Sequence, residues 1–246
     1  MTAPYPVRIL YAGGCHIVGY PVGPEHAFPL VVARQLEASG IASESHLLPY
    51  VALHQFKKAI EACGRFRPDI LVLQLGNYEL GSELGQYLLS RLGCKRKRKS
   101  SSSSAGGPIA NRPRYSTRAR VKQWIDQCLG HPLVDFPVVS ARFEEFLAAT
   151  AHSGCQVVLT TPTPCADATA RYYRLRALPI LEAAAARHNC LYVDLMALGC
   201  AVKQQSLGRD LFFADAIHLG IAGQAAVGQA LAVHIRKVVQ SAAIQA

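Results

Sequence analysis

The chain contains 246 residues, half of them hydrophobic, and carries a formal net charge of +10. This composition excludes a disordered protein and suits one α/β domain over residues 1–246, because a chain of this length can bury a sizeable core. No apolar stretch is long enough to cross a membrane, and no basic start precedes an apolar run, so we expect neither a membrane span nor a signal peptide.

Short apolar runs alternate with helical patterns along the first part of the chain. The run at 7–12 stops at two glycines, which indicates a buried strand that ends in a tight turn. A helical pattern at 29–39 follows, then a strand at 45–51 and a helix at 55–63. The run at 68–76 is apolar on both faces, as expected of a central parallel strand.

The positive charge is concentrated in one segment, which follows a short helical stretch near 87–91. Residues 95–122 hold ten basic and no acidic side chains, and the remaining chain holds sixteen of each sign. We define residues 94–120 as the basic insertion; its serine- and glycine-rich composition predicts a flexible loop within the domain. The Lys95–Lys99 run could attract an anionic partner, such as an acidic carrier protein or a membrane surface, or could simply be a solvated loop. Nucleic acid is a weaker expectation, because no aromatic or glycine-rich binding motif accompanies the charges.

The alternation continues to the end of the chain. Strands are predicted at 156–161 and 191–195, and helices at 141–153, 170–188 and 222–240. Five strands that alternate with helices predict a parallel sheet with helices on both faces. The fold class expected from this pattern is a three-layer α/β sandwich of flavodoxin-like type.

Two segments far apart in the sequence carry groups suited to nucleophilic catalysis. Cys15 follows the first predicted strand, and Asp215 and His218 form an Asp-x-x-His pair before the last helix. The carboxyl ends of parallel strands share one edge of the sheet, so these segments can meet there. We interpret Cys15 as nucleophile, His218 as base and Asp215 as the group that orients the histidine. His16 is a rival base, although adjacent side chains usually diverge.

The cysteine pattern argues against a metal site. No Cys-x-x-Cys pair and no zinc-like spacing of cysteine and histidine occurs among the eight cysteines, and a reduced, cytoplasmic location fits this pattern best. We expect four of the other cysteines to be small buried apolar residues; these are Cys63, Cys155, Cys190 and Cys200.

Both motifs resemble those of the SGNH (GDSL-type) hydrolase superfamily. The first block of that superfamily reads Gly-Asp-Ser after the first strand, and its last block reads Asp-x-x-His before the final helix. The resemblance implies an SGNH-type α/β fold and acyl transfer, with Cys15 in place of the serine and Gly14 in place of the acidic residue. It implies no metal and no organic cofactor.

The same resemblance locates the donors that would stabilise the oxyanion. The superfamily uses the nucleophile's own amide, a glycine amide and the asparagine of a Gly-x-Asn-Asp block. The glycine has no counterpart within 48–54, and the third block reads Gly76-Asn77-Tyr78-Glu79, which puts Tyr78 where the asparagine belongs. The candidate oxyanion or substrate-binding residues are therefore Gly14, Asn77 and Tyr78, although the last two could equally be a strand-ending turn.

These observations favour an acyl hydrolase or acyltransferase that acts on a small or carrier-bound ester or thioester through a Cys-His-Asp triad and an acyl-thioenzyme. The alternative is a catalytically silent SGNH-like protein that binds an acyl or carbohydrate ligand. A nucleic-acid-associated protein is a third and weaker alternative.

Overall fold

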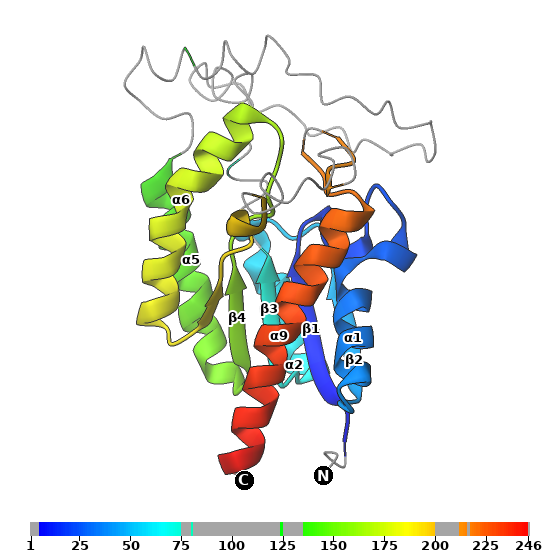
Figure 1. Ribbon diagram of the computed structural model, residues 1–246. Helices are drawn as coiled ribbons and strands as arrows, with labels where there is room; N and C mark the ends of the chain where they lie inside the picture. Colours follow the sequence, from blue (N-terminus) through cyan, green and yellow to red (C-terminus); the bar gives the residue numbers. More distant parts are fainter. Residues whose placement is uncertain are drawn as a thin grey trace.

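The computed structural model describes residues 5–74, 80, 124, 135–199, 212–215 and 217–245. In this part of the chain the strands form one parallel sheet in the order β2-β1-β3-β4-β5 (Figure 1). The strands are β1 (Val7–Gly13), β2 (Ser43–Leu48), β3 (Ile70–Gln74), β4 (Gln156–Thr160) and β5 (Leu191–Val193). The main helices are α1 (Phe28–Ala38), α2 (Phe56–Phe66), α5 (Phe136–Thr150), α6 (Ala168–Arg187) and α9 (Ile221–Gln245).

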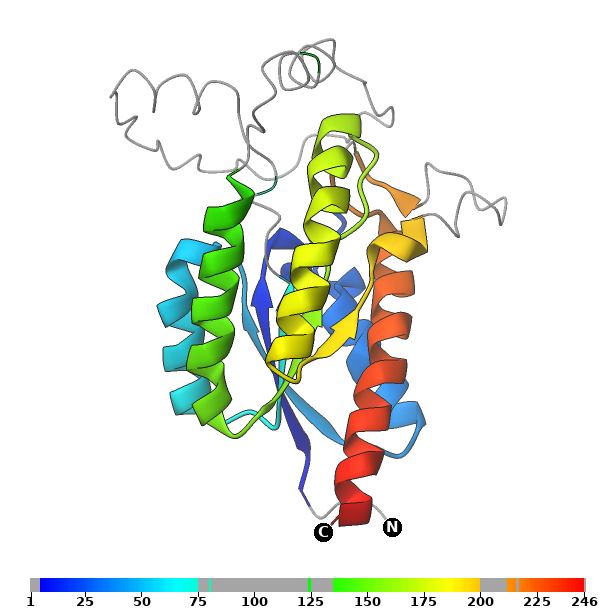
Figure 2. The ribbon, with the colours of Figure 1, turned by 90° about the vertical axis from the view of Figure 1, so that its left-hand side faces the viewer.

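Helices cover both faces of the sheet, because the central strands are apolar on both sides. In β1, Ile9 and Tyr11 point into a core shared with α1 and α9, whereas Leu10 points into a core shared with α2, α5 and α6. The same alternation in β3 separates Val72 from Leu71. Figure 2 shows the two groups of helices on opposite sides of the sheet. The predicted three-layer sandwich is thus confirmed.

The boundaries differ from the sequence prediction in two informative places. The predicted helix at 141–153 begins at Phe136, where the Asp135 side chain accepts a hydrogen bond of 3.1 Å from the Val138 amide and so caps the first turn. The second strand begins and ends earlier than predicted, and most of its residues are exposed because it lies at the edge of the sheet. The predicted helix at 87–91 and the basic insertion lie outside the described residues, so the insertion and the one-domain organisation stay predictions.

A close contact between α1 and α9 holds the last helix of the chain against the sheet. Helices α1 and α9 lie side by side (Figure 1) and approach so closely that a Cβ at Gly228 would lie 2.5 Å from the Cβ of Val31. At the same crossing, the buried side chain of Gln224 accepts a hydrogen bond of 3.1 Å from the Phe28 amide. These contacts hold the start of α9, which follows the Asp-x-x-His segment. None of the described helices is both long and apolar enough to cross a membrane.

Candidate active site

The nucleophile candidate lies at the carboxyl end of β1. A Cβ at Gly13 would lie only 2.1 Å from the Gln74 carbonyl oxygen, so the ends of β1 and β3 can meet only with glycine there. The Gly14 amide donates a 3.3 Å hydrogen bond to Oε1 of the buried Gln74 side chain. Cys15 then opens a short 3-10 helix, Cys15–Val18, in which its amide has no acceptor within the helix. Gln74 closes the clearest buried strand, but no motif in the sequence marks it as a site residue.

The second part of the site is the Asp-x-x-His pair, which precedes α9. Asp215 Oδ1 accepts hydrogen bonds of 2.7 Å from the backbone amides of Ile217 and His218, and Asp215 Oδ2 accepts one of 2.7 Å from His218 Nδ1. An antiparallel bridge between Phe213 and Leu219 closes the segment on either side. The aspartate therefore fixes both the local backbone and the orientation of the imidazole ring.

Cys15 and His218 interact directly, and this contact joins the two segments. The Asp215 carboxylate occupies Nδ1, so Nε2 is the nitrogen of His218 that remains for the Cys15 sulfur. Burial lowers the pKa of His218, but the hydrogen bonds that its ring makes with Asp215 and Cys15, together with their electrostatic effect, outweigh burial and raise that pKa to about 9. Burial raises the pKa of Asp215, and its hydrogen bonds with His218 and the two amides outweigh burial and lower that pKa to about 2. The surroundings of His218 therefore favour its charged, imidazolium form.

His16 holds the two segments together and is not available as a base. Its ring is 1% exposed, and Nε2 accepts a 3.2 Å hydrogen bond from the Leu219 amide, next to His218. With Nε2 an acceptor, the ring proton is on Nδ1, which faces the Thr163 hydroxyl at 3.4 Å. Burial, then the nearby charges of His218 and Arg174, lower the pKa of His16 to about 3, so the ring stays neutral. The contact of His16 with the Leu219 amide had no signal in the sequence.

A buried positive charge lies beside this network. The Arg174 side chain on α6 is 1% exposed, and its Nη1 donates a 2.6 Å hydrogen bond to the Thr163 carbonyl oxygen. Nε has no acceptor and the guanidinium has no carboxylate partner among the residues that the structure describes. The arrangement thus places an uncompensated cation next to His16 at the carboxyl edge of the sheet.

The structure therefore brings together Cys15, His218 and Asp215, three of the six predicted site residues. Gly14 lies beside them, but its amide is engaged by Gln74. Asn77 and Tyr78 lie outside the described residues, so their roles stay predictions. Within the described ranges, no group of three or more histidine, cysteine or carboxylate side chains could hold a metal ion.

The burial predicted for the other cysteines holds only in part. Cys63 is buried, as expected. The prediction was wrong for Cys155 and Cys190, which are partly exposed because each lies immediately before a strand, β4 and β5 respectively, rather than within it. Cys200 lies outside the described residues.

Comparison with solved structures shows that this fold is shared with SGNH-type esterases. An acetylxylan esterase from Geobacillus stearothermophilus has a TM-score of 0.60 at 13% sequence identity, with 92% of each chain covered. The acetyl xylan esterase AlAXEase has a TM-score of 0.56 at 14% identity, with 92% of this chain and 98% of that chain covered. A psychrotrophic esterase from Pseudoalteromonas sp. has a TM-score of 0.56 at 11% identity, with 95% and 98% covered.

No protein-family model and no curated protein sequence matches the chain. At these identities the structural likeness establishes the fold alone.

Proposed function

We propose that this protein is an acyl hydrolase or acyltransferase that acts on an ester or thioester through Cys15, His218 and Asp215. The observation that carries the proposal is the continuous contact from the Cys15 sulfur through His218 to the Asp215 carboxylate, at the sheet edge where α/β folds bind ligands. The raised pKa of His218 supports an imidazolium beside the Cys15 sulfur, and a neighbouring cation of this kind favours nucleophilic attack by a cysteine. The esterases with the same fold support acyl chemistry at this edge.

The proposed reaction has two steps. The Cys15 thiolate attacks the acyl carbonyl carbon, and the developing oxyanion receives a hydrogen bond from the Cys15 amide. As the tetrahedral intermediate collapses, His218 Nε2 gives its proton to the leaving oxygen or sulfur, and a thioester remains on Cys15. His218 then takes a proton from water or another acceptor, which attacks the thioester and releases the thiol. Asp215 holds the ring in the required orientation throughout.

The experiment that tests this proposal is intact-mass analysis after incubation with activated acyl esters and thioesters. The parent should gain one acyl group that peptide mapping assigns to Cys15, and Cys15→Ala should lack this adduct, whereas any acylation of the second reactive thiol, Cys155, should be the same in both proteins. Cys165→Ala is the matched control, because Cys165 is a buried cysteine with no part in the proposed triad. If the parent forms no acyl-enzyme with any ester or thioester tried, the acyl-transfer mechanism is wrong. The silent binding protein for an acyl or carbohydrate ligand would then be the better hypothesis.

A second donor for the oxyanion is expected from Asn77 or Tyr78. Loss of one such donor typically lowers the rate about a hundred- to a thousandfold, so Asn77→Ala or Tyr78→Phe should slow acylation of Cys15. Alkylation of the same thiol develops no oxyanion and should be nearly unchanged. Equal acylation rates in the parent and both variants would exclude these two residues as donors.

We keep a cytoplasmic location as a prediction from the cysteine pattern, together with an anionic partner for the Lys95–Lys99 run.

A further inference from the structure

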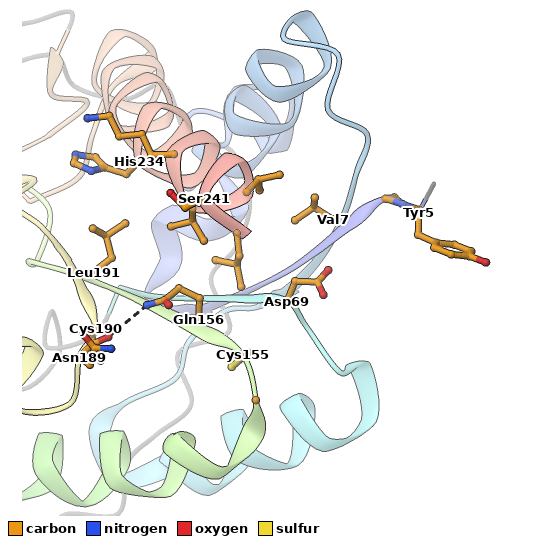
Figure 3. A pocket seen from close by; sticks show the side chains of 16 residues that line it. Tyr5, Val7, Asp69, Cys155, Gln156, Asn189, Cys190, Leu191, His234 and Ser241 are labelled. Carbon is orange, nitrogen blue, oxygen red and sulfur yellow. Dashed lines mark hydrogen bonds between the residues drawn. The ribbon is translucent and has the colours of Figure 1, made fainter. Parts of the chain in front are cut away.

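A groove lies at the edge of the sheet opposite the candidate active site. It has a volume of about 1100 Å³, and the first residues of four strands line it, namely Val7, Ile70, Gln156 and Leu191. Two cysteines also line this groove, Cys155 immediately before β4 and Cys190 immediately before β5 (Figure 3). Small solutes in the groove can therefore reach thiols that the proposed acyl chemistry does not use.

A third thiol contacts one of these two from the covering helix. Cys63 lies near the end of α2, is 3% exposed, and its side chain hydrogen bonds to that of Cys155. The Ser153 hydroxyl lies 2.9 Å from the Cys155 sulfur and also donates a 2.6 Å hydrogen bond to the Thr150 carbonyl oxygen. The Ser153 hydroxyl has a single hydrogen, which it donates to Thr150. It therefore accepts a hydrogen bond from the protonated Cys155 thiol. Once that thiol ionises, the hydroxyl can rotate and donate its own hydrogen to the sulfur.

These contacts give the three thiols different pKa values. The hydrogen bond from Cys63 lowers the pKa of Cys155 to about 6, against the effect of burial and with help from Ser153. The same interaction raises the pKa of Cys63, which keeps its proton while Cys155 is charged. Burial, then the charge of Cys155, raise the pKa of Cys190 to about 11, and its thiol contacts the His188 carbonyl oxygen at 3.6 Å. Near neutral pH, Cys155 is the nucleophilic sulfur of this cluster.

We propose that Cys155 and Cys63 form a peroxide-sensitive thiol pair, remote from Cys15, that closes to an intramolecular disulfide. The oxidant is hydrogen peroxide or an organic peroxide. The Cys155 thiolate attacks one peroxide oxygen, the O–O bond breaks, and the products are a sulfenic acid and hydroxide, or alkoxide, which takes a proton from water. The Cys63 sulfur then attacks the sulfenic sulfur, the S–O bond breaks, and the Cys63 proton leaves with the hydroxyl as water. Oxidation also removes the negative charge that had raised the pKa of Cys63, which frees this thiol to react.

The first test is peptide mapping of the full chain after a brief exposure to dilute hydrogen peroxide at pH 7, with free thiols blocked and no reductant. We expect a peptide that links Cys63 to Cys155, and its disappearance after reduction. We also expect Cys155 to oxidise at least about tenfold faster than Cys190, because a thiol with a pKa of about 11 holds only about one thiolate in ten thousand at pH 7, and the higher intrinsic nucleophilicity of that thiolate offsets this only in part. An unoxidised Cys155 under conditions that oxidise Cys15, or a Cys155–Cys190 link, would overturn the proposal.

Two single-residue variants test separately that Cys155 is the thiol that is oxidised first and that Cys63 is its disulfide partner. Cys63→Ser should stop at the Cys155 sulfenic acid, which dimedone traps, whereas the matched control Cys190→Ser should still form the disulfide. Circular dichroism verifies that each variant is folded, and if Cys63→Ser does not fold, the linkage map of the parent and of Cys190→Ser decides alone. Loss of the link in Cys190→Ser, or no dimedone adduct in folded Cys63→Ser, would contradict the proposed pair.

Discussion

Replacement of His218 by alanine should change how alkylation of Cys15 depends on pH. In the parent, the His218 pKa rises from 6.5 to about 9, and this shift corresponds to ~3 kcal/mol in favour of the imidazolium. The imidazolium stabilises a neighbouring thiolate, so labelling of Cys15 should vary little between about pH 6.5 and 8. Without the histidine, labelling should rise with pH as it does for an ordinary thiol.

The size of the difference follows from the thiolate population. An ordinary thiol with a pKa of about 8.5 is only about 1% thiolate at pH 6.5, so a fully ionised thiol has about a hundredfold larger reactive fraction. A stabilised thiolate is intrinsically less nucleophilic, and a Brønsted coefficient of about 0.4–0.5 reduces that advantage to about tenfold. We therefore expect His218→Ala to lower Cys15 labelling about tenfold at pH 6.5, and this difference to disappear and then reverse towards pH 9, where an ordinary thiol is also largely ionised and is intrinsically more nucleophilic.

The assay is labelling with limiting iodoacetamide, read by mass spectrometry of the Cys15 peptide alone. Peptide resolution is essential, because the low pKa of Cys155 makes it a second reactive thiol. Asp215→Asn serves as the graded variant: it retains the ring but weakens the bond that raises the pKa of His218, so its profile should lie between those of the parent and His218→Ala. Coincident profiles for all three proteins would show that Cys15 and His218 do not act as one site.

Three further outcomes are expected. Gly228→Ala should lower the free energy of unfolding by about 1–3 kcal/mol in denaturant titrations, because the new Cβ forces α9 away from α1; an unchanged midpoint would contradict the close crossing. His16→Leu removes the acceptor of the Leu219 amide and should slow acylation about tenfold or more while also shifting the NMR-detected pKa of His218, whereas a purely structural role would leave that pKa in place. Deletion of residues 95–107 should leave the thermal midpoint nearly unchanged, and a large drop would show that this segment is packed.

Most of the fold could be predicted because every described strand except the edge strand β2 has its own apolar signal. The run that contains Leu71 and Val72 is apolar on both faces, and only a central strand with helices on both sides buries such a run. The start of α5 was missed because Pro137 interrupts the helical pattern, although proline is well tolerated in the first turn after a capping residue such as Asp135. Side-chain capping is a local contact that hydrophobic periodicity does not report.

The site residues that could be predicted are those whose residue type and motif indicate a chemical role. Those that act through long-range packing contacts could not be predicted. Cys15, Asp215 and His218 belong to recognisable motifs, and the sheet topology predicts that they meet at one edge. Nothing in the sequence indicated that His16 would accept a hydrogen bond from Leu219, because that contact joins residues more than two hundred positions apart. The contact of Cys63 with Cys155 was missed because it also joins separate elements: the two thiols meet only where α2 packs against the segment that precedes β4.

The buried guanidinium of Arg174 has a consequence for the stability of the whole protein. Removing a cation from water without a counter-ion costs several kcal/mol, whereas an apolar side chain of similar length buried in the same place usually stabilises a fold. Arg174→Met should therefore raise the thermal midpoint of unfolding, in contrast to most substitutions of a fully buried residue. A library of variants selected only for heat resistance should therefore contain substitutions of Arg174. If these variants are more stable but less active than the parent, the buried arginine lowers stability in favour of activity.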